Sequence, residues 1–325
     1  MWRYIVRRLL LGVITILVIT FVVYALLWAL PEKPYAFLIN RPNQSLAAKQ
    51  AIIERFGADK PFIYQYGVFL KNLVHFDLGE SLTQHTTVAN AIGLRIGNTG
   101  ILMISSYIVT LLIAVPIGII SAVKQYSKLD NVVTSLSFVG ISLPNFWFGS
   151  MLIFAFAVFP HSHGFPTIFP EGGMHSNNAT GILDLAWHLV LPVIVLAVQG
   201  IAQYARYIRS SMLEVLSQDY IRTARAKGLA ENRVVLRHAL RNSLLPLITL
   251  MGLDIPQLFV GAVITEFVFN WPGMGRLFVD AATANDYSIL LGILLILSVF
   301  VVIGNLLADL AYTWADPRIS YESSR

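Results

Sequence analysis

The sequence predicts an all-α integral membrane protein with six transmembrane helices. Of its 325 residues, 56% are hydrophobic and only 13% are charged, whereas a soluble domain carries about 25% charged residues. A helix needs about 20 mostly apolar residues to cross a bilayer. Six stretches meet this requirement, and they lie at about 9–30, 99–122, 132–158, 186–205, 244–266 and 288–312.

The first stretch is interpreted as a span that stays in the protein. It follows a basic lead, "MWRYIVRR", and it is too long for the core of a cleaved signal peptide. The chain has no cysteine, which excludes disulfides, thiolate catalysis and cysteine-ligated metal.

The basic residues predict that both termini are cytoplasmic, because cytoplasmic loops are enriched in lysine and arginine. With this orientation, eight basic residues between Arg206 and Arg241 face the cytoplasm, and the external loop from His161 to Asp184 has none. The domain organisation that follows is given by residue range: 1–30 for the N-terminus and first span, 31–98 for an external helical subdomain, 99–312 for a five-span core with a cytoplasmic loop at 206–243, and 313–325 for a cytoplasmic tail.

The external subdomain is expected to contain two helices that lie against the membrane. Ser45 is a typical cap before "LAAKQAIIERF", and Gly57 is a typical stop after it. A second helix is predicted to start at Pro61, in "PFIYQYGVFLKNLVHF". The later external loop is expected to be irregular, and its histidines do not form a carboxylate-histidine pattern, so no metal site is predicted.

A basic segment, "DYIRTARAKGL", separates the fourth and fifth apolar stretches. We expect Asp219 to cap a helix that starts at Tyr220 and stops at Gly228. Ala224 and Gly228 then share a face with Tyr220, and such small residues let another surface approach closely. The basic side chains suit an acidic groove or anionic lipid headgroups, and a plain juxtamembrane helix that sets topology explains the spacing equally well. The basic side chains of this segment are Arg222, Arg225 and Lys227.

This segment and the following "RHALRNSLLPLIT" resemble the cytoplasmic signature of permease subunits of ATP-binding-cassette importers, in the dipeptide/oligopeptide branch. In that signature a Glu-Ala-Ala triplet is followed, after three intervening residues, by a glycine; Arg222, Thr223 and Ala224 stand at the triplet and Gly228 at the glycine. Six further stretches resemble the same branch in the same order: "GADKPFIYQY", "FDLGESL", "SLPNFWFG", "EFVFNWPGMGRL", "NDYSIL" and "DPRIS". The resemblance therefore covers nearly the whole chain.

The resemblance implies a non-enzymatic subunit of a bacterial cell-membrane importer. Its partners would be a second, similar permease, two ATPase subunits that carry ATP and Mg²⁺, an external binding protein, the peptide substrate and membrane lipid, with no nucleic acid and no cofactor on this chain. The basic helix would be the coupling helix, seated in a groove on one ATPase. Its contact residues would be Tyr220, Arg222, Thr223, Ala224, Arg225, Lys227 and Gly228.

The sequence leaves further functions open. Similar permeases in the branch serve nickel, glutathione or other small solutes, so the substrate is less defined than the role. A stand-alone secondary transporter and an integral-membrane enzyme are two further classes that an apolar chain of this length allows. The chain has no Gly-Lys dipeptide, and hence no phosphate-binding loop of its own, which favours a subunit energised by another chain.

Polar residues inside the predicted spans are candidate pathway residues, because each is costly unless it faces protein or water. Asp254 and Gln257 lie in the fifth span, with Asp254 about 15 Å deep; its carboxylate could meet a peptide amino terminus or bond to a neighbouring helix. Gln199 and Gln203 share one face of the fourth span and either line the pathway or join helices.

The stretch "FNWPGMGRL" after the fifth span is either a gate that contacts the binding protein or an interfacial turn. The candidate contact residues in it are Trp271, Pro272 and Gly273.

Overall fold

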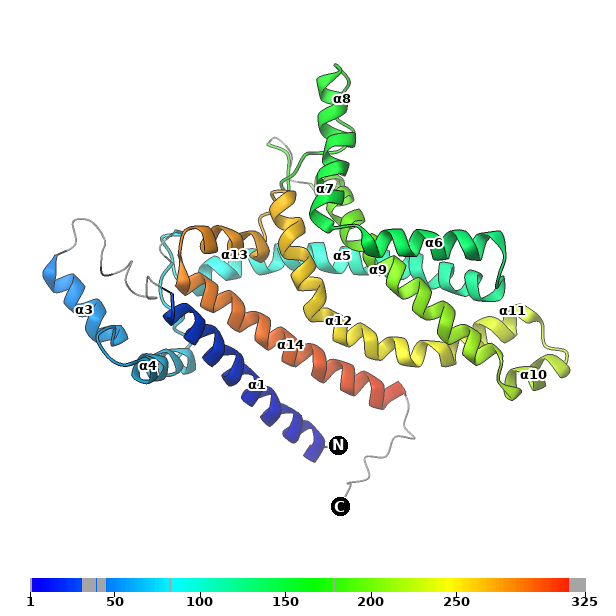
Figure 1. The fold of residues 1–325 in the computed structure, drawn as a ribbon, viewed down its shortest axis with the longest axis horizontal. Coiled ribbons are helices and arrows are strands. Elements are labelled where there is room, and N and C mark those ends of the chain that lie inside the picture. Colours follow the sequence, from blue (N-terminus) through cyan, green and yellow to red (C-terminus); the bar gives the residue numbers. More distant parts are fainter. Residues whose placement is uncertain are drawn as a thin grey trace. The chain divides into compact units, whose positions relative to one another are not determined.

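The computed structural model of this chain describes residues 2–30, 39, 45–81, 83–177, 179 and 181–315. In these ranges the chain is helical, and its only extended pairing is one isolated bridge between Glu80 and Thr87. The helices are α1 (Trp2–Trp28), α3 (Leu46–Phe56), α4 (Phe62–Val74), α5 (Val88–Val123), α6 (Lys128–Ser142), α7 (Asn145–Ile153), α8 (Phe159–Ser162), α9 (Ile182–Leu216), α10 (Asp219–Ala226), α11 (Glu231–Arg233), α12 (Leu240–Val268), α13 (Met274–Thr283) and α14 (Tyr287–Ala315), with π-helical turns η1 (Phe154–Val158) and η2 (Val234–Ala239) (Figure 1). The prediction of an all-α fold is confirmed.

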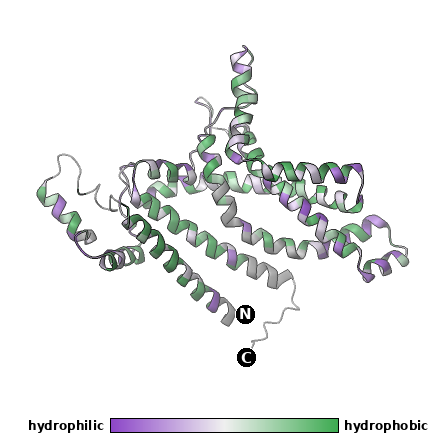
Figure 2. Ribbon diagram, viewed as in Figure 1, coloured by the Kyte–Doolittle hydropathy of each residue, from purple (hydrophilic) through white to green (hydrophobic). Residues whose placement is uncertain are grey.

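Several of these helices are long and apolar enough to cross a membrane. Among the described residues, four qualify by length and composition: Val6–Trp28, Val88–Val123, Ile182–Leu216 and Tyr287–Leu307. Figure 2 shows hydrophobic residues along most of α1 and α14. A fifth span exists if the pair Lys128–Ser142 and Asn145–Ser162 counts as one. The chain therefore has several candidate spans, and the count of six and the cytoplasmic termini stay predictions.

The expected continuous helix at 132–158 is wrong, because the chain bends by 99° between α6 and α7. Leu143 is extended (ψ 121°), and Pro144 caps the next helix. Proline has no N–H to continue the helical ladder, and it pushes the residue before it out of the helical region. The side-chain amide of Gln199 donates to the Leu143 carbonyl at 3.0 Å, which satisfies a backbone acceptor at the break.

The chain forms two compact units, Met1–Asn98 with Gly273–Ile303 and Thr99–Pro272 with Gly304–Arg325. In the first unit, the Ser45 hydroxyl accepts from the Ala48 N–H at 3.2 Å, and Gly57 adopts a left-handed conformation (φ 60°), so the predicted boundaries of α3 are confirmed. Pro61 precedes α4, whose aromatic residues contact those of α1. The Tyr66 hydroxyl also donates to the Leu17 carbonyl of α1 at 3.1 Å.

In the second unit, α9 packs closely against α5 and α6. A Cβ at Gly118 of α5 would lie 2.8 Å from the Ala205 carbonyl oxygen and 2.8 Å from the Ile208 Cβ. At Gly140 of α6, a Cβ would lie 3.3 Å from Ala202 Cβ. Small residues allow such close approach between apolar helices in a membrane, where packing rather than water drives association.

Candidate functional site

The basic segment forms the short helix α10, between α9 and the turn that leads to α12. The expected cap is wrong by one residue: Gln218 is the extended residue before the helix, and Asp219 is its first residue. A carboxylate in the first turn still interacts favourably with the positive end of the helix dipole. Gly228 (φ 75°) ends the segment in the left-handed region, as expected.

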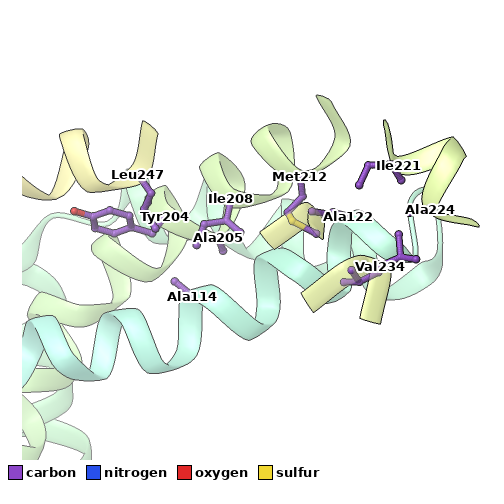
Figure 3. Close-up of a cluster of buried hydrophobic side chains, with 12 residues drawn as sticks. Ala114, Ala122, Tyr204, Ala205, Ile208, Met212, Ile221, Ala224, Val234 and Leu247 are labelled. Carbon is purple, nitrogen blue, oxygen red and sulfur yellow. The ribbon is translucent and has the colours of Figure 1, made fainter. Parts of the chain in front are cut away.

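One face of α10 is buried in the chain's own core. Ile221 is fully buried and Ala224 is 7% exposed, and both belong to a cluster that includes Met212 of α9 and Val234 of η2 (Figure 3). The surface that approaches Ala224 closely is therefore this chain itself. At Gly228, expected on the same face, an added Cβ would meet no atom of the described chain within 4 Å apart from its sequence neighbours.

The remaining predicted coupling residues are exposed. They are Tyr220, Arg222, Thr223, Arg225, Lys227 and Gly228. The helix therefore has an anchored apolar face and an exposed face that carries three basic side chains.

Two contacts hold this exposed face in place. The Arg225 guanidinium donates to both carboxylate oxygens of Glu231, at 3.1 and 2.6 Å. This hydrogen bonding holds the pKa of Glu231 below its ordinary value and raises the pKa of Arg225, so both groups stay charged near neutral pH. The Asn242 amide donates to the Tyr220 hydroxyl at 3.1 Å, which ties α10 to the start of α12.

Asp254 of α12 bonds to a neighbouring helix, which was one of the two roles that the sequence left open. Its Oδ2 accepts from the Tyr204 hydroxyl of α9. The Tyr204 oxygen lies 3.0 Å from the Tyr107 hydroxyl of α5. Since the single Tyr204 proton is directed to the carboxylate, Tyr107 is the donor in the second bond. This chain of hydrogen bonds joins α5, α9 and α12.

The predicted glutamines have different surroundings. Gln199 bonds to the break between α6 and α7 and therefore joins helices, whereas Gln203 is exposed on α9. Gln257 lies in α12, but its side chain is outside the described residues.

Trp271 is fully buried, in a cluster with Leu102, Val193 and Leu196. Its side chain packs in the chain's own core, and its role as a contact of a binding protein stays a prediction. Pro272 is half-buried and the buried Gly273 precedes α13, and a gate role for these two residues stays a prediction.

The loop between α8 and α9, predicted to be external, is irregular as expected, and the Asp184 carboxylate contacts two of its residues. Asp184 accepts from the Ser176 hydroxyl at 2.7 Å and from the Ser176 N–H at 3.0 Å, and His175 Nδ1 lies 3.1 Å from its second oxygen. His188 Nδ1 donates to the Gly173 carbonyl at 3.1 Å. Across the described part of the chain, no group of three or more histidines, aspartates and glutamates could hold a metal ion.

A buried ion pair near α10 was missed by the sequence interpretation. The Asp130 carboxylate of α6, 2% exposed, accepts two hydrogen bonds from the Arg209 guanidinium of α9, at 2.6 and 2.8 Å. The available signal was an aspartate three residues after a capping serine, Ser127, and an arginine shortly after the end of an apolar stretch. Neither residue alone predicts its partner.

Apolar helices of spanning length, with an exposed basic helix between two of them, define a multi-pass membrane protein. Comparison with known proteins gives the family. The chain belongs to the binding-protein-dependent transport system inner membrane components: the model of this family matches residues 114–321, and the model of its N-terminal part matches residues 1–103.

Relatives in this family are similar over their full length. The chain is 44% identical over 323 residues to the oligopeptide transport system permease protein AppB of Bacillus subtilis, covering 99% of this chain and 100% of that protein. It is 35% identical over 340 residues to the dipeptide transport system permease protein DppB of Escherichia coli, covering 99% and 100%. The chain is thus a membrane permease subunit and not itself an enzyme.

A solved structure shares the fold. The methionine ABC transporter MetNI, in an inward-facing conformation, matches with a TM-score of 0.56 at 16% identity, over 70% of this chain and 96% of that chain.

Proposed function

We propose that this chain is one of two permease subunits of an ATP-driven importer of short peptides, located in a bacterial inner membrane. Its full-length identity of 44% with a permease named for oligopeptides, and of 35% with one named for dipeptides, supports the peptide substrate. The family's dependence on a binding protein supports an external partner that delivers the substrate.

The proposed topology has six spans with both termini in the cytoplasm. In it, α12 supplies the fifth span and the bent pair α6–α7 belongs to the third. Residues 1–30, 31–98, 99–312 and 313–325 keep the roles assigned above, and the tail after Ala315 lies outside the described residues. The abundance of basic residues between Arg206 and Arg241 supports this orientation.

One observation supports a coupling role for α10: this short basic helix is exposed on one face, and its other face is buried in the hydrophobic core of the second unit. The exposed arginines and lysine suit an acidic groove on a partner ATPase, where ATP and Mg²⁺ would bind. Because Ile221 and Ala224 are packed, a displacement of α10 cannot be absorbed locally and must move its neighbours. The chain would then convert ATPase closure into a change of access to the pathway.

Asp254 is the strongest candidate for a polar residue beside the pathway. Its second oxygen is left for other donors when Oδ2 accepts from Tyr204. A peptide amino terminus is a hydrogen-bond donor whose positive charge is opposite to that of the carboxylate. Gln203, exposed on α9, is the second candidate.

The test of the coupling role is a cysteine cross-link in the native host, because the chain has no cysteine of its own. Arg222→Cys places one thiol on the exposed face of α10, and His85→Cys places a matched exposed thiol in the external segment. We expect a short cross-linker to capture an ATPase subunit from Arg222→Cys but not from His85→Cys, with a yield that changes when nucleotide is trapped. Capture of lipid only, in a folded complex, would leave α10 as a topology signal.

The substrate is tested separately in proteoliposomes that contain the complete transporter. Uptake of labelled dipeptides and oligopeptides should depend on ATP and on the binding protein. Uptake of nickel or glutathione without peptide uptake would keep the importer role and reject the peptide substrate.

A further inference from the structure

The Asp130 carboxylate accepts hydrogen bonds from three parts of the second unit: α5, the α5–α6 turn and α9. Besides the two bonds from Arg209 of α9, it accepts from the Ser121 hydroxyl at the end of α5. The Tyr126 N–H in the α5–α6 turn donates to its Oδ2 at 2.9 Å. A buried carboxylate with this many donors, two of them from a bidentate guanidinium, has its charge fully compensated.

The same carboxylate is hydrogen-bonded to a residue with an unusual backbone conformation, Tyr126. Tyr126 has φ 62°, a left-handed conformation that is rare for a bulky residue and persists only where surrounding contacts require it. The bond from its N–H to Asp130 is such a contact. The shape of the α5–α6 turn therefore depends on Asp130.

The ion pair borders the core that carries α10. Ser121 and Arg209 are each next in sequence to a member of that core, Ala122 and Ile208 respectively. Figure 3 shows Ala122 and Ile208 in the same cluster as Met212, Ile221 and Ala224. Around α10 the apolar side chains of this cluster contact one another without a preferred direction, whereas the bidentate ion pair permits one orientation of its two partners.

We infer that Asp130 and Arg209 are positioning residues that lock the α5–α6 turn to α9, so that α10, α9 and this turn move as one rigid body. This inference rests on the proposed coupling role of α10, and it adds which helices receive the motion. The apolar contacts of Ile221 and Ala224 would push α9 when α10 is pressed toward it. The ion pair would prevent α9 from rotating or sliding past α5 and α6. Without the pair, a displacement of α10 is lost between these helices instead of reaching the pathway.

The direct test measures a distance in the complete transporter with two nucleotide states. Gln125→Cys in the α5–α6 turn and Ser217→Cys before α10 are both exposed, and spin labels at these thiols report the separation across the ion pair. Electron–electron double resonance should give the same narrow distance distribution without nucleotide and with ATP and vanadate. A distance that differs between the two states would overturn the rigid-body inference.

A second test compares uptake with ATP hydrolysis. Arg209→Gln should retain ATP hydrolysis and lower the peptide transported per ATP by about tenfold, within the range that loss of a coupling contact produces. It should also broaden the spin-label distribution. Lys128→Gln is the matched control, because it removes one positive charge from an exposed position at the start of α6; its coupling ratio and distance distribution should be unchanged.

The double variant Asp130→Asn/Arg209→Gln decides the outcome where the single variant fails to fold, because it leaves no uncompensated buried charge. We expect it to assemble and to remain uncoupled. A double variant with a normal coupling ratio and a narrow distribution would refute the positioning role. Wild-type ATP-driven uptake and capture from Arg222→Cys test the proposed function itself, so a failure of the inference is distinguishable from a failure of that function.

Discussion

Gly118 offers a sharp test of the helix packing, because its position between α5 and α9 has no room for a methyl group. A Cβ there would lie 2.8 Å from the Ala205 carbonyl oxygen, whereas ordinary contact begins at 3.4 Å, so α9 would have to move by about 0.6 Å. Overpacking of this kind costs about 1–3 kcal/mol. Replacement of glycine by alanine in a helix interior also contributes about 1 kcal/mol of stability through helix propensity.

The propensity gain is common to every glycine of the same helix, so a second glycine on α5 isolates the packing cost. At Gly100, nothing in the described chain lies within 4 Å of the position that a Cβ would take. We expect Gly118→Ala to be less stable than Gly100→Ala by about 1–3 kcal/mol, with Gly140→Ala between them because its contacts are 3.3 Å. Thermal unfolding of the detergent-solubilised protein, followed by size-exclusion chromatography, measures the order. Equal stability of the Gly118 and Gly100 variants would show that α5 and α9 do not pack as closely as in this structure.

Three further changes test other contacts. Tyr204→Phe removes the donor to Asp254 and should destabilise the protein by about 1–3 kcal/mol, seen as a lower unfolding temperature; an unchanged temperature would contradict that hydrogen bond. Glu231→Gln removes the partner of Arg225 and should speed amide exchange in α10 at about pH 7, at a cost of about 0–1 kcal/mol for this exposed pair. Because the folded pKa of Glu231 is lowered, its stabilising effect is present above the ordinary value and is lost as pH falls through the folded pKa, so wild type and variant should converge in acid; a difference that persists there would have another cause. Ser45→Ala removes the cap of α3 and should cost about 1 kcal/mol, measured as faster amide exchange at the start of that helix; unchanged exchange would show that the cap does not stabilise it.

The local features of the fold could be predicted from sequence, because they depend on neighbouring residues. Ser45 and Gly57 bound α3 as expected, since capping requires only a side chain and a backbone a few residues apart. The break at Pro144 was missed although proline carried the signal. The long apolar run on both sides favoured one continuous span, and hydropathy does not report the backbone direction.

The candidate site was predictable as a segment but not as a set of contacts. The position of the basic helix followed from its sequence, whereas the burial of Ala224 followed from the apolar residues of α9 and η2 that pack on it. Asp254 was recognised as costly in a membrane, yet its partner, Tyr204, lies 50 residues away in sequence. Pairings between distant helices depend on how the helices pack, and one sequence does not contain that information.

The order of α10 depends on its surroundings, and this dependence bears on the proposed coupling role of so short a helix. A helix of 8 residues is marginal in water by itself, since isolated helices shorter than about 12–15 residues are not stable. Its order therefore comes from Ile221 and Ala224, which are buried against α9 and η2. The direction of the basic face is consequently set by the spans and not by the helix itself. In the proposed coupling role, a partner that binds this face would act on α9 directly, and the pair of Asp130 and Arg209 would determine which helices move with it.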